Sequence, residues 1–137
     1  MTLDIILNKT ETIRRCIQRI HEEYQQNEEN LNILTKQDSI ILNLQRACEA
    51  CIDIAMHIVS DRKLGIPQNS RDAFQILEQH NLITKEISSR MNAMVGFRNI
   101  AVHDYQTIQL IIVKNIITHH INDFSSFAEQ SLSIAKQ

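Results

Sequence analysis

Glycine and proline, the residues that most strongly mark turns, are almost absent from this sequence, which contains only two glycines and one proline among 137 residues. A fold of many β-strands needs such residues every few positions, whereas long helices need very few. Apolar residues make up 43% of the chain and charged residues 22%, which is typical of a globular protein with a hydrophobic core. The sequence therefore predicts an all-α protein, and its length fits one domain over residues 1–137.

Hydrophobic periodicity predicts four long helices and one short helix. In each segment, apolar residues recur at steps of three and four positions, which places them on one face of a helix. The predicted helices cover residues 3–26, 39–62, 71–79, 85–102 and 108–135. The second of these is apolar over a broad face, which favours a central place in an up-and-down helical bundle.

The connections between the helices are short and polar. Residues 27–37 are predicted to join the first two helices, and residues 61–69 form the clearest break because they contain Gly65 and Pro67. Side chains suited to capping precede the second, third and fourth helices, and the predicted N-caps are Asp38, Ser70 and Thr84.

Several classes of protein are disfavoured by composition. No apolar run approaches the ~20 residues that a membrane-spanning helix needs, and the start of the chain lacks the basic region of a secretory signal. An odd number of cysteines, three, argues against a disulfide framework and for a reducing compartment, so we expect a cytoplasmic protein. The net charge of −2 does not favour nucleic-acid binding through the overall field of the protein.

The strongest candidate site is the run from Phe97 to Tyr105, which contains Arg98, Asn99, His103 and Tyr105. Cleavage of RNA without a metal needs a base for the 2′-OH proton, an acid for the leaving oxygen and a cation beside the phosphate. Histidine suits the proton transfers because its pKa lies near neutrality, and the arginine fork suits the phosphate. Arg98 and His103 are therefore a candidate catalytic pair, and the alternative is the ordinary structural role of an arginine and a histidine near a helix end.

Helix geometry constrains how Arg98 and His103 meet. Five residues correspond to a rotation of about 500°, which leaves the two side chains about 140° apart around an unbroken helix. Asn99 and His103 are four apart and share a face, so Asn99 is a candidate to orient the imidazole. Either the helix distorts near its end, or Arg98 acts across a symmetric dimer. The motif contains one histidine per chain, which favours the dimer, since acid and base then come from two subunits.

Other candidate residues have simpler structural interpretations. Cys48 and Cys51 form a Cys-x-x-Cys pair inside a predicted helix, but no second pair lies at the spacing that a zinc site needs, so core packing is expected. His119 and His120 are adjacent, and a helix directs them about 100° apart. A metal or phosphotransfer bundle built on them is disfavoured because no Glu-x-x-His pair occurs. We predict no metal and no cofactor. Gly96 is expected either to permit the close approach of another backbone or to be a tolerated small residue.

The pattern Arg98-Asn99-x-x-x-His103-x-Tyr105, near the end of the penultimate long helix, resembles the HEPN superfamily, and more narrowly the HepT toxins of HEPN–MNT toxin–antitoxin pairs. The second predicted helix is also similar to that family's pattern from Asn43 to Ala55, with Asp53 at its acidic position. The resemblance covers nearly the whole chain.

This resemblance implies a metal-independent endoribonuclease that acts as a homodimer on mRNA or tRNA, in a type VII-like toxin–antitoxin pair. Arg98 and His103 would be catalytic, with Asn99 as a supporting polar residue. Tyr105 would be the residue that a cognate MNT-type nucleotidyltransferase antitoxin modifies with AMP, which adds a bulky anion beside the cleft. The alternative interpretation is a catalytically silent helical partner that docks to a nucleotidyltransferase or presents Tyr105 to it.

Overall fold

The computed structural model describes residues 2–137, and no β-strand occurs among them. The all-α prediction is therefore confirmed. The α-helices are α1 (Thr2–Tyr24), α2 (Leu34–Asp61), α3 (Ser70–Gln79), α4 (Lys85–His103), α5 (Leu110–Asn115) and α6 (Asn122–Ala135). Short 3₁₀ helices cover Glu28–Asn32 and Tyr105–Thr107, and a π-helical segment covers Ile116–His120.

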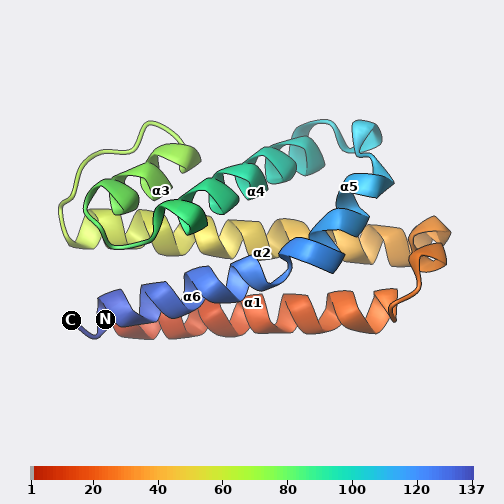
Figure 1. Ribbon diagram of the computed structural model, residues 1–137, viewed down its shortest axis with the longest axis horizontal. Coiled ribbons are helices and arrows are strands. Elements are labelled where there is room, and N and C mark those ends of the chain that lie inside the picture. The colour runs from red at the N-terminus through yellow and green to blue at the C-terminus, as the bar shows by residue number, and fades with distance from the viewer. Residues whose placement is uncertain (1) are drawn as a thin grey trace.

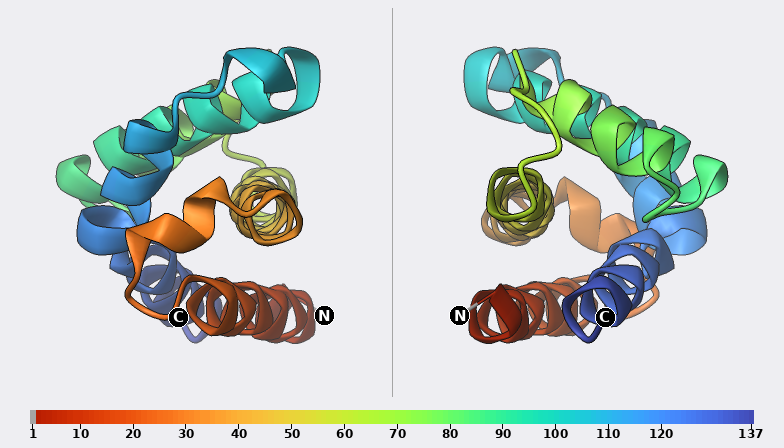
Figure 2. Two further views of the ribbon diagram at one scale, coloured as in Figure 1. Left: turned by 90° about the vertical axis from the view of Figure 1, so that its right-hand side faces the viewer. Right: turned by 90° about the vertical axis from the view of Figure 1, so that its left-hand side faces the viewer.

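Helix α2 is the centre of the bundle, as its broad apolar face predicts. It packs against α1, α3, α4 and α6, and Figure 2 shows it between a layer of α1 and α6 on one side and α3 and α4 on the other. The two chain ends lie at the same end of the long axis in Figure 1, whereas the turn between α4 and α5 lies near the opposite end. This arrangement places the end of α4 close to the start of α2.

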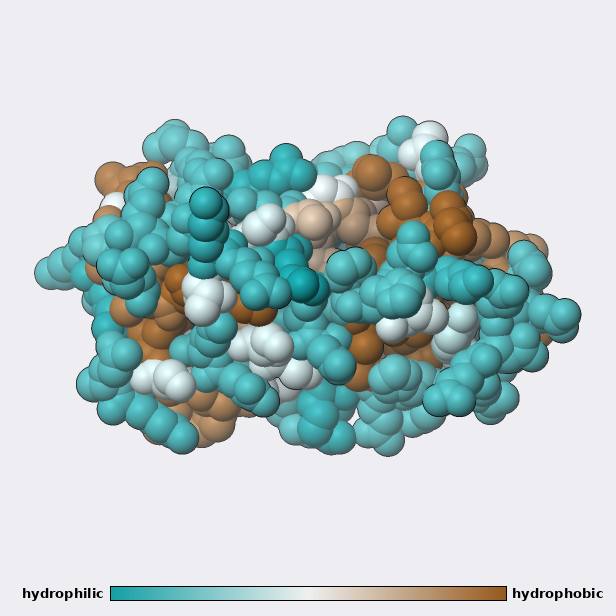
Figure 3. All heavy atoms as spheres, viewed as in Figure 1, coloured by the Kyte–Doolittle hydropathy of each residue, from teal (hydrophilic) through white to brown (hydrophobic). Residues whose placement is uncertain are grey.

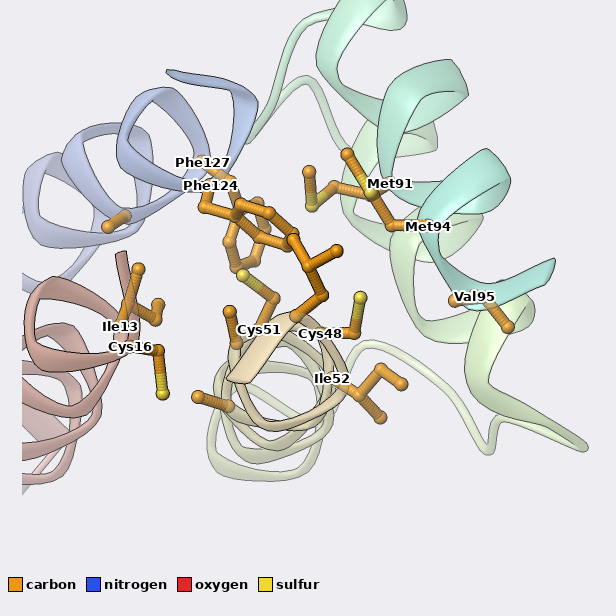
Figure 4. Packing of buried hydrophobic residues seen from close by; sticks show 14 of the residues in the cluster. Ile13, Cys16, Cys48, Cys51, Ile52, Met91, Met94, Val95, Phe124 and Phe127 are labelled. Carbon is orange, nitrogen blue, oxygen red and sulfur yellow. The ribbon is translucent and has the colours of Figure 1, made fainter. Parts of the chain in front are cut away.

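Large side chains from every long helix meet in one core. Phe74 of α3 and Phe127 of α6 contact each other edge to face, with ring centroids 5.3 Å apart. Cys48 and Cys51 project from α2 into the same core, near Met94 and Phe124 (Figure 4). The apolar area that these side chains remove from water is the main stabilisation of the bundle.

The start of α2 differs from the prediction. Left-handed backbone at Gln25 and Gln26, with φ of 51° and 55°, ends α1, and a 3₁₀ helix follows within the predicted connection. Helix α2 then begins at Leu34, after an N-cap residue without a side-chain cap bond. Asp38 is consequently inside the helix, and its prediction as an N-cap was wrong.

The N-cap prediction is confirmed for α4 and wrong for α3. Thr84 caps α4, because its hydroxyl accepts a hydrogen bond from the Ile87 amide at 3.2 Å. For α3 the prediction of Ser70 was wrong by one residue: the Asn69 side chain accepts from the Asp72 amide at 3.0 Å. Ser70 is the first helical residue, and its hydroxyl is free to contact another helix.

The last predicted helix, residues 108–135, is divided in the structure. It begins at Leu110 and changes to π-helical pairing over Ile116–His120 before α6. Periodicity over a single turn cannot distinguish π-helical from α-helical pairing, because the two place neighbouring apolar residues on similar faces. The other helix boundaries agree with the predictions within two residues.

None of the described helices combines the length and the hydropathy that crossing a bilayer requires.

Candidate functional site

The predicted site lies where α4 ends. Helix α4 remains α-helical from Lys85 to His103, and the Asp104 amide donates to the Ile100 carbonyl at 2.8 Å before the chain leaves the helix. His103 is therefore the last helical residue, and it is exposed. The side chain is therefore accessible to a ligand at the end of the helix.

Arg98 lies closer to the core and is partly buried against the start of α3. Its Nη2 donates a hydrogen bond to the Ser70 hydroxyl at 3.0 Å, while its buried Nε has no partner among the described residues. The guanidinium borders a polar cavity of about 310 Å³, which is also lined by Asn69, Arg71 and Asn99. An arginine fixed on one side with a small polar cavity on the other has the features of an anion-binding group.

A second arginine borders the same cavity. Arg71 lies across α4, where its Nε donates to the Asn92 carbonyl at 3.3 Å. A Cβ atom added at Gly96 would lie 2.9 Å from the Arg71 Nη2 atom. Within the described chain, the group that approaches Gly96 closely is therefore the Arg71 side chain.

The regularity of α4 decides between the two ways in which Arg98 and His103 were expected to meet. Because the helix is unbroken through both residues, the side chains leave it about 140° apart. Distortion of the helix is therefore excluded within the described chain. Asn99, which is exposed, precedes His103 by four residues and lies on its face. One chain does not bring Arg98 and His103 to the same face.

Tyr105 is part of the turn that follows α4, and it contacts α2. Its hydroxyl donates a hydrogen bond to the Asp38 carboxylate, 67 residues away in sequence, and its side chain keeps 40% of its surface exposed. Partial burial, together with the hydrogen bond and negative charge of Asp38, raises the pKa of the Tyr105 phenol to about 12. Sequence analysis missed Asp38 as a partner of Tyr105, and no local signal in the sequence identifies so distant a contact.

An apolar groove runs beside the candidate site on the other side of α4. Its volume is about 430 Å³, and Met94, Phe97, Ile100, Ile108 and Ile112 contribute most of its apolar lining. Ile100 and Ile112 are 42% and 44% exposed. Figure 3 shows a concentration of apolar surface in the same region, over the end of α4 and α5.

The Cys-x-x-Cys pair has a structural role. Cys48 and Cys51 are buried free thiols, and burial raises the pKa of both above the ordinary value, so that they stay protonated. Among residues 2–137, no cluster of three metal-binding side chains occurs. The prediction that the Cys-x-x-Cys pair packs in the core is confirmed.

The sequence is similar to a known protein family and to two nucleases. The family model described as "Ribonuclease HepT-like" matches residues 13–131. The chain is 55% identical over 126 residues to the mRNA nuclease HepT of Shewanella oneidensis. The aligned region covers 92% of this chain and 95% of that protein. It is 30% identical over 87 residues to the tRNA nuclease HepT of Aphanizomenon flos-aquae, over 64% of this chain and 59% of that protein.

The fold is similar to that of a solved toxin–antitoxin complex. The structure of tri-AMPylated Shewanella oneidensis HEPN toxin in complex with MNT antitoxin superposes with a TM-score of 0.89, at 52% identity over 98% of each chain. The bundle described above is therefore the HEPN bundle, as the sequence resemblance implied.

Proposed function

We infer the function of this protein from the premise that the chain belongs to the ribonuclease HepT-like family, whose model covers most of its length. The protein is a ribonuclease and the toxin of an HEPN–MNT toxin–antitoxin pair. Its partner is an MNT antitoxin, and AMPylation neutralises the toxin. Because the more similar of the two nucleases is named for mRNA, we propose mRNA as the substrate.

Within this function, we assign catalysis to Arg98 and His103 and propose that it needs no metal. His103 exchanges the protons of the 2′-OH and of the leaving oxygen, and Arg98 stabilises the charge that develops on the phosphate. Asn99 orients the imidazole from the same face of α4. The observation that carries this assignment is the Arg98 guanidinium, which Ser70 holds beside a polar cavity.

We further propose that the active form is a homodimer with one composite site. A regular α4 directs Arg98 and His103 to different faces, so a phosphate that contacts both needs a second copy of the chain. The exposed apolar groove beside α4 gives such a copy a surface to bury. Two subunits then supply two histidines, one acting as acid and the other as base.

We propose Tyr105 as the residue that receives AMP. It is partly exposed and lies two residues after His103, so an added nucleotide occupies the space beside the cleft and opposes RNA by its size and charge. We also propose that residues 1–137 are one domain, since one continuous core joins all the long helices, and that the protein is cytoplasmic, since its three cysteines are free thiols.

Cleavage in the presence of a chelator tests the metal-free mechanism. Unmodified protein, purified free of antitoxin, should cleave mRNA in excess EDTA at the rate seen with added Mg²⁺, because imidazole and guanidinium supply all three catalytic functions. Gel analysis of labelled mRNA and tRNA measures the rate and the substrate preference, with AMPylated protein as the inactive control. Activity that disappears in EDTA and returns with a divalent cation would contradict the proposal.

A further inference from the structure

The hydrogen bond between Tyr105 and Asp38 contributes too little to folding stability for stability to be its main role. Both side chains are exposed to solvent, and a hydrogen bond between exposed groups competes with water and contributes little to folding. What the contact does fix is the position of the phenolic hydrogen, which points from the Tyr105 oxygen to a carboxylate on α2. The residue proposed to receive AMP therefore has a proton acceptor already in place.

We propose that Asp38 is the general base for the AMPylation of Tyr105, so that the toxin itself supplies a catalytic group for its own neutralisation. This inference rests on the proposed function, in which Tyr105 is the modified residue. It adds a catalytic role for a residue of the toxin that the cleavage of RNA does not use.

The reaction is balanced without any further reactant beyond the nucleotide donor. The Tyr105 oxygen attacks the α-phosphorus of ATP, and the bond between that phosphorus and the bridging oxygen of pyrophosphate breaks. The O–H bond of Tyr105 breaks in the same step, and its proton passes to the Asp38 carboxylate, which is exposed and releases the proton to solvent. The products are the tyrosine AMP ester and pyrophosphate.

Geometry and acidity both support this role. A general base must lie within hydrogen-bonding reach of the proton that it accepts, and Asp38 meets that requirement before any partner binds. Aspartate serves in the same way in protein kinases, where it accepts the proton of the substrate hydroxyl during phosphoryl transfer. The raised pKa of the Tyr105 phenol means that it keeps its proton at neutral pH, so the attacking oxygen needs an acceptor.

Exposure of the pair is compatible with approach by a nucleotidyltransferase. Tyr105 is 40% exposed, and Asp38 is on the solvent side of α2 near its start. After the transfer, the phosphodiester of the AMP group is an anion beside the Asp38 carboxylate. Repulsion between these charges favours movement of the modified side chain away from α2.

The test uses the purified antitoxin, ATP with Mg²⁺, and unmodified toxin carrying Asp38→Asn, Asp38→Ala or Asp38→Glu. The initial rate of AMP addition to Tyr105 is measured by mass spectrometry of the peptide. We expect Asp38→Asn and Asp38→Ala to slow modification by about 10²- to 10⁴-fold, and Asp38→Glu to retain most of the rate. Asp61→Asn, which removes another exposed carboxylate of α2, is the matched control and should modify at the wild-type rate.

The Asp38→Asn variant distinguishes a general base from a residue that only positions Tyr105. Its amide oxygen still accepts the Tyr105 hydrogen bond but cannot take the proton. A wild-type rate in Asp38→Asn would overturn the inference, whether or not Asp38→Ala is slow. Circular dichroism and antitoxin binding, unchanged across the variants, show that the fold and the complex are intact. If wild-type toxin is modified on a residue other than Tyr105, the proposed function is what fails, and this outcome is distinct from a fast Asp38→Asn variant.

Discussion

His103→Ala is expected to lower the rate of RNA cleavage by about 10²- to 10⁴-fold, the range typical of general acid–base groups. His103 is the last residue of α4 and is exposed, so the substitution removes no core contact. Its effect on folding should stay below about 1 kcal/mol, which is the scale of a lost charge–dipole interaction at a helix end. Single-turnover cleavage in EDTA measures the chemical step directly.

His119→Ala is the matched control for this prediction. His119 is also exposed and lies in the π-helical segment, away from the end of α4. Its removal should leave both the cleavage rate and the thermal midpoint unchanged. Cleavage by His103→Ala at the wild-type rate would remove the proposed mechanism, whatever the dimer geometry.

Arg98→Lys is expected to lower kcat/KM by about 10²-fold or more. The substitution keeps the charge but loses the planar fork, which binds two phosphate oxygens at once, and the loss resembles the removal of one preorganised donor from an oxyanion site. The single ammonium group of lysine also cannot donate a hydrogen bond to the Ser70 hydroxyl and at the same time direct other donors into the cavity, as the arginine fork does. Steady-state cleavage of a short labelled RNA gives kcat and KM separately.

Arg71→Lys serves as the control because Arg71 borders the same cavity, yet its Nε is already bonded to the Asn92 carbonyl. Its effect should be less than tenfold and mainly on KM, as expected of a group that adds positive charge without touching the scissile phosphate. A large loss in Arg71→Lys with normal cleavage by Arg98→Lys would assign the phosphate to Arg71.

The helices could be predicted from the sequence because helix formation depends mainly on residues that are close together in the chain. Scarcity of glycine and proline, together with apolar steps of three and four, was enough to locate α1, α2, α3 and α4 within a few residues. Thr84 was correctly predicted as a cap, since a cap bond joins residues three apart. The π-helical segment was not predictable, because five residues do not establish a different period.

The two wrong caps have a common cause that bears on function. Asp38 and Ser70 are residue types that favour caps, but the structure uses their side chains elsewhere: Asp38 accepts from Tyr105, and Ser70 accepts from Arg98. The contacts join residues 67 and 28 positions apart in sequence, so local reasoning had no access to them. Both partners, Tyr105 and Arg98, were themselves predicted as site residues.

The proposed composite site follows from the spacing of the sequence motif within one chain. Spacing placed Arg98 and His103 on different faces of any regular helix, and α4 is regular. What the sequence left open was whether the helix bends or a second subunit completes the site. The structure excludes the bend, so we propose that a second subunit completes the site and also supplies a second copy of His103.

Mixed dimers test that claim most directly. Wild-type and His103→Ala subunits, carrying different tags, are exchanged at known ratios, and the cleavage rate is measured at each ratio. If acid and base are the His103 side chains of two subunits, activity follows the square of the wild-type fraction, and an equal mixture retains about one quarter of the wild-type rate. A linear decline, with about one half of the rate in the equal mixture, would show that one His103 is enough for a working site and would contradict the requirement for both copies.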